Sequence, residues 1–566
     1  MASRADLVLD GGRIVTLDGS ARIVPALAIG DGKILAAGDS AQVRALAGAA
    51  TKIVDLGGRT VIPGLVDAHA HMDREGLKEM LPSLAGCASI GDIQARIAAL
   101  AARRPPGEWI VTMPVGDPPE YRDVPQCLAE GRFPTRHDLD AAAPDHPVYI
   151  RAIWGPWRHT LPLVSIANSK ALALAGVTRD AQPPSPSITI DRDALGDPTG
   201  VFIENSLTPL AEFTLMAAAP HFSLEERIAG LERSMAIYNA LGTTSIFEGH
   251  GVAADVLAAY ESVHRRSRAT VRSTLTFSPA WSLTRGAAAA EVFASWGKWL
   301  AGRGYGDTWL RLMGMHAEIG DQQDHRLRAR LLPQTGWAGF NYDANLPRDA
   351  LKELLLECAR SEVMVVGLTP PMLEMFAEVD AQVPLAGKRW SLGHIIDLDR
   401  ERIARIVDMG LIVTTHTSRY LYREGSDLKR KLGPGREDEI VPLRSLLDAG
   451  VRVCLASDNV PPNLFKTLWH VVARRSRDGE IVGASQALTR MEALACASRN
   501  GAYLSHEEDC KGTLEPGKFA DLAVLDQDIL ACAQDEISGI QVAMTIVDGR
   551  IVHDAASLSK GTGHGE

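Results

Sequence analysis

The feature that most constrains the fold is the alternation of short apolar β runs with longer amphipathic segments between residues 63 and 511. This alternation is typical of a parallel sheet, in which each helix returns the chain to the start of the next strand. After a first strand that ends at His71, seven more are predicted: Thr243–Phe247, Val271–Phe277, Leu310–His316, Val363–Leu368, Trp390–Ile396, Leu411–Thr415 and Val451–Ala456. Eight such units predict a closed (β/α)₈ barrel with its active site at the C-terminal ends of the strands.

The barrel is expected to be interrupted once. Ser223 and Glu226 have the spacing of a capping box, which predicts a helix from there to Leu241 with Gly242 as its stop. Residues 86–222 break the alternation and are rich in Pro, Trp and Arg. We interpret them as a domain inserted after the first strand and able to cover the barrel mouth. The barrel itself then comprises residues 63–85 and 223–511.

Both ends of the chain carry hairpin signals, in which acid–glycine turns separate short apolar runs. The predicted pairs are Leu7–Leu9 with Arg13–Leu17, Ala26–Ile29 with Lys33–Ala36, and Ala543–Val547 with Arg550–Val552. A further strand is expected at Ala520–Leu525. Neither end has enough apolar area to be stable alone. Residues 1–62 and 512–556 are therefore expected to form one composite β-sandwich domain.

Charge and cysteine usage exclude several classes of partner. The net charge of −11 argues against binding to nucleic acid or to an anionic membrane, which attract positively charged surfaces. No apolar stretch is long enough to cross a bilayer. The 7 cysteines are scattered and never spaced as Cys-x-x-Cys, which argues against a disulfide framework and a thiolate zinc site. We expect a cytoplasmic enzyme.

Four residues at predicted strand ends indicate a metal site. His69 and His71 are two residues apart, so in an extended strand they point to the same face. His394 follows the sixth predicted strand, and Asp458 follows the eighth, which neighbours the first in a closed barrel. Imidazole and carboxylate ligands suit Zn, Fe, Mn or Co. The structural alternatives are a core histidine at His394 and a helix cap at Asp458.

Several longer motifs resemble the amidohydrolase superfamily, and specifically its third family, which includes N-substituted formamide deformylases. The resemblance is carried by Pro-Gly-Leu-Val-Asp-Ala-His-Ala-His at 63–71, Leu-Asp-Ala-Ala-Ala-Pro-Asp-His-Pro-Val at 139–148, Leu-Ala-Ser-Asp at 455–458 and Gly-Thr-Leu-Glu-Pro-Gly-Lys-Phe-Ala-Asp-Leu-Ala-Val-Leu at 512–525. It implies a distorted TIM-like barrel with a β-sandwich built from both termini. The implied activity is metal-dependent hydrolysis of a C–N bond in a small non-peptide amide or N-substituted formamide. Zinc is the expected metal, and a homodimer is the expected assembly.

The chain departs from this family at two strand ends. Relatives often carry a lysine on the fourth strand and a histidine at the end of the fifth, but residues 312–318 contain no lysine and residues 363–370 no histidine. A single metal held by His69, His71 and Asp458 is therefore expected, with His394 as a further ligand or a substrate contact. Glu248, followed by His250 after the second strand, is the first candidate for a substitute ligand.

The remaining candidates are expected to contact substrate. They are His316 and His416, at the ends of the fourth and seventh strands, and Trp157 and His159, in the insertion. Each could equally be structural.

In the expected mechanism the metal activates a water, Asp458 accepts its proton and passes it to the leaving nitrogen, and His394 or His416 donates a hydrogen bond to the developing oxyanion. Two alternatives remain: hydrolysis of another bond (ester, carbamate or C–C), or a non-catalytic scaffold.

Overall fold

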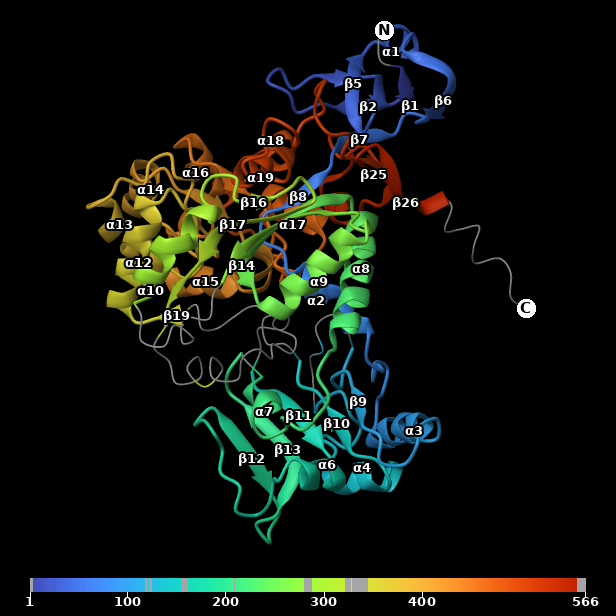
Figure 1. Cartoon of the computed structure of the whole chain (residues 1–566), viewed down its shortest axis with the longest axis vertical. Helices are drawn as coiled ribbons and strands as arrows, with labels where there is room; N and C mark the ends of the chain where they lie inside the picture. Colours follow the sequence, from blue (N-terminus) through green and yellow to red (C-terminus); the bar gives the residue numbers. More distant parts are fainter. Residues whose placement is uncertain are drawn as a thin grey trace.

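The protein is described from a computed structural model that covers residues 4–117, 121, 125–153, 161–207, 209–278, 288–320, 327 and 345–556. Its central sheet has eight strands that are parallel to one another and neighbour each other in sequence order. The sheet lies in the middle of the molecule, between the sheets of the chain ends and the inserted segment (Figure 1). They are β8 (Leu65–Asp67), β14 (Thr243–Val252), β15 (Arg272–Phe277), β17 (Leu310–His316), β20 (Val365–Gly367), β21 (Ser391–Leu392), β22 (Ile412–Thr414) and β23 (Val453–Cys454). A short strand, β16 (Tyr305–Gly306), pairs antiparallel with β17.

Helices connect successive strands of this sheet. They are α8 (Leu224–Ala240), α9 (Ala254–Arg265), α10 (Ala289–Trp296), α12 (Arg348–Arg360), α13 (Pro371–Asp380), α14 (Arg400–Asp408), α15 (Gly425–Leu432) and α16 (Leu443–Asp448), followed after β23 by α17 (Leu464–Ala473), α18 (Arg490–Cys496) and α19 (Arg499–Leu504). The capping box before α8 is confirmed: Glu226 N–H donates to Ser223 Oγ at 3.3 Å, and Ser223 N–H donates to Glu226 Oε2 at 2.7 Å.

The residues that follow the first and last strands hydrogen-bond to each other and bring the two edges of the sheet together, as in a TIM-like barrel. Ala68 N–H donates to the Leu455 carbonyl at 3.2 Å, and Asp458 N–H donates to the His69 carbonyl at 3.0 Å. Apolar side chains from several strands fill one buried cluster, among them Phe247, Met313, Val366, Ile412 and Cys454. The predicted strands are thus present, but most are shorter than expected. In particular β8 ends at Asp67, so His69 and His71 lie in the loop that follows the strand rather than on it.

The two ends of the chain contribute strands to the same sheet. β7 (Thr60–Pro63) pairs antiparallel with β24 (Leu522–Leu525), within the order β26-β25-β24-β7-β2-β3. The other strands of this sheet are β2 (Arg13–Val15), β3 (Ile23–Val24), β25 (Val542–Val547) and β26 (Arg550–Asp554). A second sheet, β5-β4-β1-β6, contains β1 (Ala5–Asp10), β4 (Ala26–Gly30), β5 (Lys33–Gly38) and β6 (Ala47–Asp55). Leu9 of the second sheet and Leu522 of the first belong to one hydrophobic cluster, so the two sheets share a core.

Two of the three predicted hairpins are confirmed, β4–β5 and β25–β26. The hairpin predicted around Asp10-Gly11-Gly12 is wrong, because β1 and β2 belong to different sheets. The chain crosses from one sheet to the other at Gly11 and Gly12, so Leu9 and Ile14 fill the shared core from opposite sheets.

The segment inserted after the first barrel strand contains its own sheet, in the order β12-β13-β11-β10-β9, at the bottom of Figure 1. Its elements are β9 (Ile110–Thr112), β10 (Val148–Ile150), β11 (Leu163–Ala167), β12 (Ile188–Arg192), β13 (Pro198–Glu204), α3 (Ile90–Ala101), α4 (Arg136–Ala142), α6 (Ser169–Leu174) and α7 (Leu210–Phe213). The domain boundaries and the covering role stay predictions. Trp157 and His159, expected to contact substrate, lie outside the described residues.

Among the helices of the described part of the chain, none combines the length and apolar character needed to cross a bilayer.

Candidate active site

The histidines predicted at the strand ends converge at the C-terminal end of the barrel. His69 and His71 come from the loop after β8, His250 from β14 and His394 from the loop after β21. Their rings pack edge to face, with the His69 centroid 4.9 Å from that of His71, 5.1 Å from that of His250 and 5.0 Å from that of His394. Three strands thus place imidazoles around one centre.

Asp458 lies where four of the imidazoles meet. Its carboxylate oxygens are 2.8 Å from Nε2 of His71 and 3.0 Å from Nε2 of His416. They are also 3.8 Å from Nε2 of His69 and 3.7 Å from Nε2 of His394. All four histidines therefore direct the same ring nitrogen toward one carboxylate.

His71 is held between two carboxylates. Its Nε2 faces Asp458, and its Nδ1 lies 2.8 Å from Oε1 of Glu248. A carboxylate behind a histidine in this way fixes the tautomer and the ring orientation and raises the basicity of the other nitrogen. Glu248 is thus close to the cluster, but its contact is with the far side of the His71 ring.

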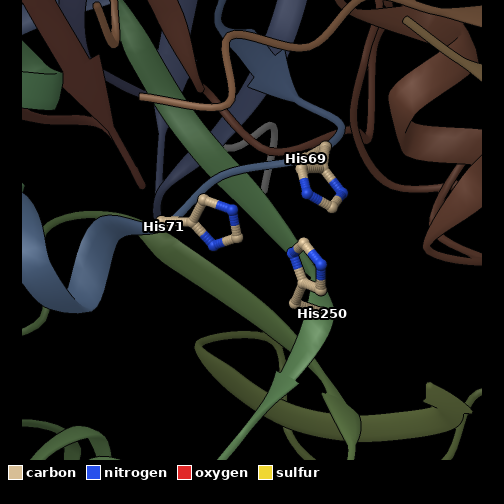
Figure 2. A group of neighbouring side chains, drawn as sticks. All are labelled: His69, His71 and His250. Atoms are coloured by element: carbon tan, nitrogen blue, oxygen red, sulfur yellow. The ribbon is translucent and has the colours of Figure 1, made fainter. Parts of the chain in front are cut away.

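His250 approaches from the second strand, where sequence reasoning favoured Glu248. Figure 2 shows the rings of His69, His71 and His250 close together, with His250 projecting from β14. The approach depends on Gly249, because a Cβ at that position would lie 2.5 Å from Nδ1 of His69. The Glu-Gly-His sequence in the last part of β14 is the signal that points to this arrangement.

Asn459 is a site residue that sequence reasoning missed. It accepts the His71 N–H at 2.9 Å and donates to the His71 carbonyl at 2.7 Å. Its side chain also contacts Tyr238 Oη, and it donates to Glu75 at 3.0 Å. Asn459 thereby ties the loop after the last strand to the loop after the first. The only sequence signal was its position beside Asp458.

The backbone is strained at the same place. His394, Asp458 and Asn459 have φ values of 50°, 52° and 55°, a left-handed conformation that is uncommon outside glycine. Such residues gather at functional sites, where the surrounding structure holds them in position.

Burial keeps three of the histidines neutral. It lowers the pKa of His69 and of His250 well below the ordinary value, and it lowers the pKa of His394 to about 3. Neutral imidazole is the form that binds a metal ion.

The centre of the cluster favours positive charge. Burial and Arg74 lower the pKa of His71, but Glu248 and Asp458 outweigh them and raise it to about 9. Burial by itself would raise the pKa of Asp458, yet attraction to His416 and hydrogen bonds from His416 and His71 hold it well below its usual range. A cation between these carboxylates is therefore well stabilised.

The side chains present fit a divalent metal. Ligand atoms of His69, His71 and His250 lie within 4.8 Å of one another, as do those of His69, His394 and Asp458. Both ring nitrogens of His69 and Nε2 of His394 are buried without a hydrogen-bond partner among the described residues. Buried polar atoms in this state are costly, and coordination of an ion would satisfy them. A third group within the same limit is His71, Asp73 and Glu248.

The two departures from the family are visible at the fourth and fifth strands. His316 ends β17, and its ring is 5.0 Å from that of His250, while Nδ1 lies 3.2 Å from the Val366 carbonyl. Burial lowers the pKa of His316 to about 4. Relatives usually carry a histidine at the end of the fifth strand, and Leu368 and Thr369 follow β20 at that place here. The carboxylate of Glu318 accepts the Thr369 N–H at 3.2 Å and also contacts Leu368 N.

Comparison with known proteins identifies the class. The model of the amidohydrolase family matches residues 52–553, so this chain belongs to that family. The N-substituted formamide deformylase of Arthrobacter pascens is 26% identical over 593 residues, which cover 97% of this chain and 98% of that protein. The resemblance inferred from the motifs is confirmed, and the chain is a metal-dependent hydrolase of the amidohydrolase family.

Solved structures agree on the fold. A metal-dependent hydrolase from Pyrococcus furiosus has a TM-score of 0.66 at 19% identity and covers 93% of this chain and 99% of its own. An adenosine deaminase from Xanthomonas campestris, solved with bound zinc, has a TM-score of 0.53 at 15% identity, covering 99% of this chain and 98% of its own.

Proposed function

We propose that this protein hydrolyses the C–N bond of a small non-peptide amide or N-substituted formamide with the help of one divalent metal ion. The observation that carries the proposal is the convergence of His69, His71, His394 and His416 on Asp458 at the C-terminal ends of the barrel strands. His250 joins the same cluster beside His69 and His71. The N-substituted formamide deformylase that aligns over nearly its whole length supports the substrate class.

The residues that would hold the ion are His69, His71 and Asp458, with His250 and His394 alongside. Glu248 was expected as a substitute ligand, but its contact with Nδ1 of His71 supports the role of orienting that ligand instead. We propose zinc as the metal, because it suits imidazole and carboxylate ligands. Zinc is also bound in the solved structure of the adenosine deaminase, which has a similar fold. When bound, the ion supplies a Lewis acid that polarises the carbonyl and activates water.

The protein side chains would then move the protons. Asp458, ionised at neutral pH, takes a proton from the attacking water and delivers it to the amide nitrogen as the C–N bond breaks, which releases an amine and a carboxylic acid. His394 is more accessible than His69, His71 or His416, with 17% of its side chain exposed against 1%, 5% and 1%. It is therefore placed to donate a hydrogen bond to the carbonyl oxygen of an arriving substrate.

The test is hydrolysis of N-benzylformamide by protein stripped of metal and reloaded with zinc, followed by release of formate and benzylamine. We expect turnover only in the loaded protein, with one zinc per chain by elemental analysis. Hydrolysis of benzyl formate without hydrolysis of the amide would favour the ester alternative. Failure to bind metal would favour a non-catalytic scaffold, and two tightly held ions would contradict the single-metal site.

A further inference from the structure

A cavity with a volume of ≈ 320 Å³ lies beside the metal cluster and has no part in the chemistry above. It is lined by η5 (Ser418–Arg423), a π-helical turn after β22, and by α17, which follows β23. Asn459 also lines it, and the side chain of Asn459 holds the His71 backbone. The cavity and the metal cluster therefore share a wall.

The lining contains two basic side chains in a chain whose net charge is −11. Arg423 and Lys466 both line the cavity, and no Asp or Glu is among the described residues of the lining. Asp535 accepts the indole N–H of Trp469 at 3.2 Å but is not part of the lining. Two cations that line one cavity would attract an anion, and charge-assisted hydrogen bonds to it would be strong.

Flat aromatic surfaces stand beside these cations. The Tyr422 ring stacks on His470 with centroids 5.0 Å apart and 21° between the planes, and the Trp469 centroid is 6.0 Å from that of Tyr422. Burial, and then the charges of Lys466 and Arg423, lower the pKa of His470 to about 3. His470 is therefore neutral at ordinary pH and adds no charge of its own to the cavity.

We propose that this cavity binds an acidic group of the substrate, a carboxylate or a phosphate, through Arg423 and Lys466, with Tyr422 as the wall for an adjoining planar group. The loops after the seventh and eighth strands are a recurrent anion-binding position in barrels of this type. The inference rests on the proposed function, because it assigns one part of the same substrate. Its consequence is that acidic amides are better substrates than neutral ones.

The first test compares two matched substrates, N-(4-carboxybenzyl)formamide and N-benzylformamide, on the zinc-loaded protein. We expect kcat/KM for the acidic substrate to exceed that for the neutral one by about tenfold or more, the scale of one charge-assisted contact. K466Q and R423Q should each lower that ratio about tenfold. K52Q, which removes a lysine from β6, should leave the ratio unchanged.

The second test measures binding without turnover. Titration calorimetry of the zinc-loaded protein with benzoate, phenyl phosphate and benzyl alcohol should show binding of at least one anion, weakened about tenfold in K466Q and unchanged in K52Q. The stronger anion identifies carboxylate or phosphate as the preferred group. If neither formamide is hydrolysed but the anion binds through Lys466, the proposed function fails and the anion site stands. If both are hydrolysed equally well and K466Q alters neither the ratio nor anion binding, the anion site is wrong and the function stands.

Discussion

At Asp458 one carboxylate contacts His71 at 2.8 Å and His416 at 3.0 Å, in a backbone conformation with φ of 52°. Asn is nearly the same shape as Asp and tolerates this conformation. D458N should therefore fold normally, but it should lose the proton acceptor and a charged ligand. We expect kcat to fall by roughly 10²–10⁴-fold, the usual value of general acid–base catalysis. The measurement is kcat, with zinc content and melting temperature determined on the same sample.

D448N is the matched control, because Asp448 ends α16 and its side chain is 64% exposed. This variant should keep its activity. A D458N protein that holds zinc and retains more than half of the wild-type rate would remove Asp458 from the mechanism. Unfolding of D458N at ambient temperature would instead indicate a structural role.

Glu248 tests whether a carboxylate orients a ligand or is itself one. In E248Q the amide oxygen can still accept from Nδ1 of His71, but the negative charge is lost. If Glu248 orients His71, E248Q should bind zinc 10- to 100-fold more weakly. This is the usual effect of changing the group that hydrogen-bonds a metal-binding histidine. The measurement is the zinc dissociation constant by competition with a chelating indicator. An unchanged affinity would exclude the orienting role, and a protein unable to retain zinc would indicate direct ligation.

Among the elements, β17 is anchored by a buried ion pair at its start. Arg311 donates to Glu507 at 2.6 Å and to the Ser505 carbonyl at 3.1 Å, and Lys511 contacts the same carboxylate at 2.5 Å. Burial raises the pKa of Glu507, but Lys511 and Arg311 outweigh it and lower the pKa to about 2. The folded state thus binds the proton more weakly than the unfolded chain does. The stabilisation is present above the unfolded pKa near 4.5 and is lost as the pH falls toward 2.

E507Q should accordingly lower the free energy of unfolding at pH 7 by roughly 3 kcal/mol. At pH 3.5 the difference from wild type should be about 1 kcal/mol smaller, because part of the wild-type advantage has been lost. Urea unfolding followed by circular dichroism at both pH values provides the measurement. E401Q changes a glutamate that is 76% exposed on α14, and it should shift stability by less than about 0.5 kcal/mol. An E507Q effect that grows as the pH falls would contradict the expected direction of this pH dependence.

For the whole molecule, the two ends of the chain are joined through β7 and β24, which pair with Ala523 opposite Ile62. Removing residues 512–566 would uncover the edge of β7 and the apolar cluster that Leu522 fills. Exposed strand edges and apolar surface promote aggregation. We expect the truncated protein to be insoluble, as measured by its soluble fraction and by size-exclusion chromatography.

A shorter truncation is the control for this prediction. Removing only residues 557–566 deletes none of the described strands and should leave a soluble protein with unchanged activity. A soluble, active protein ending at residue 511 would show that the barrel does not need the C-terminal strands.

Local sequence determined the order of the elements and the positions of most candidate ligands. Apolar periodicity and turn residues indicated all eight barrel strands, and the capping box at Ser223 indicated the start of α8. His69, His71, His394 and Asp458 could be predicted because each directly follows an apolar run, and the strands of a parallel barrel end on one face. These signals depend on residues near each other in the chain.

Tertiary structure alone decided which of these residues touch. β1 and β2 are neighbours in sequence but belong to different sheets. His250 approaches His69 across Gly249, and Asn459 hydrogen-bonds the backbone of His71, although these residues are distant in sequence. The register and stagger of neighbouring strands and the paths of the loops set these distances. A one-residue change in register would turn the side chains of a strand to the other face, so a single sequence read by its local pattern leaves such contacts open.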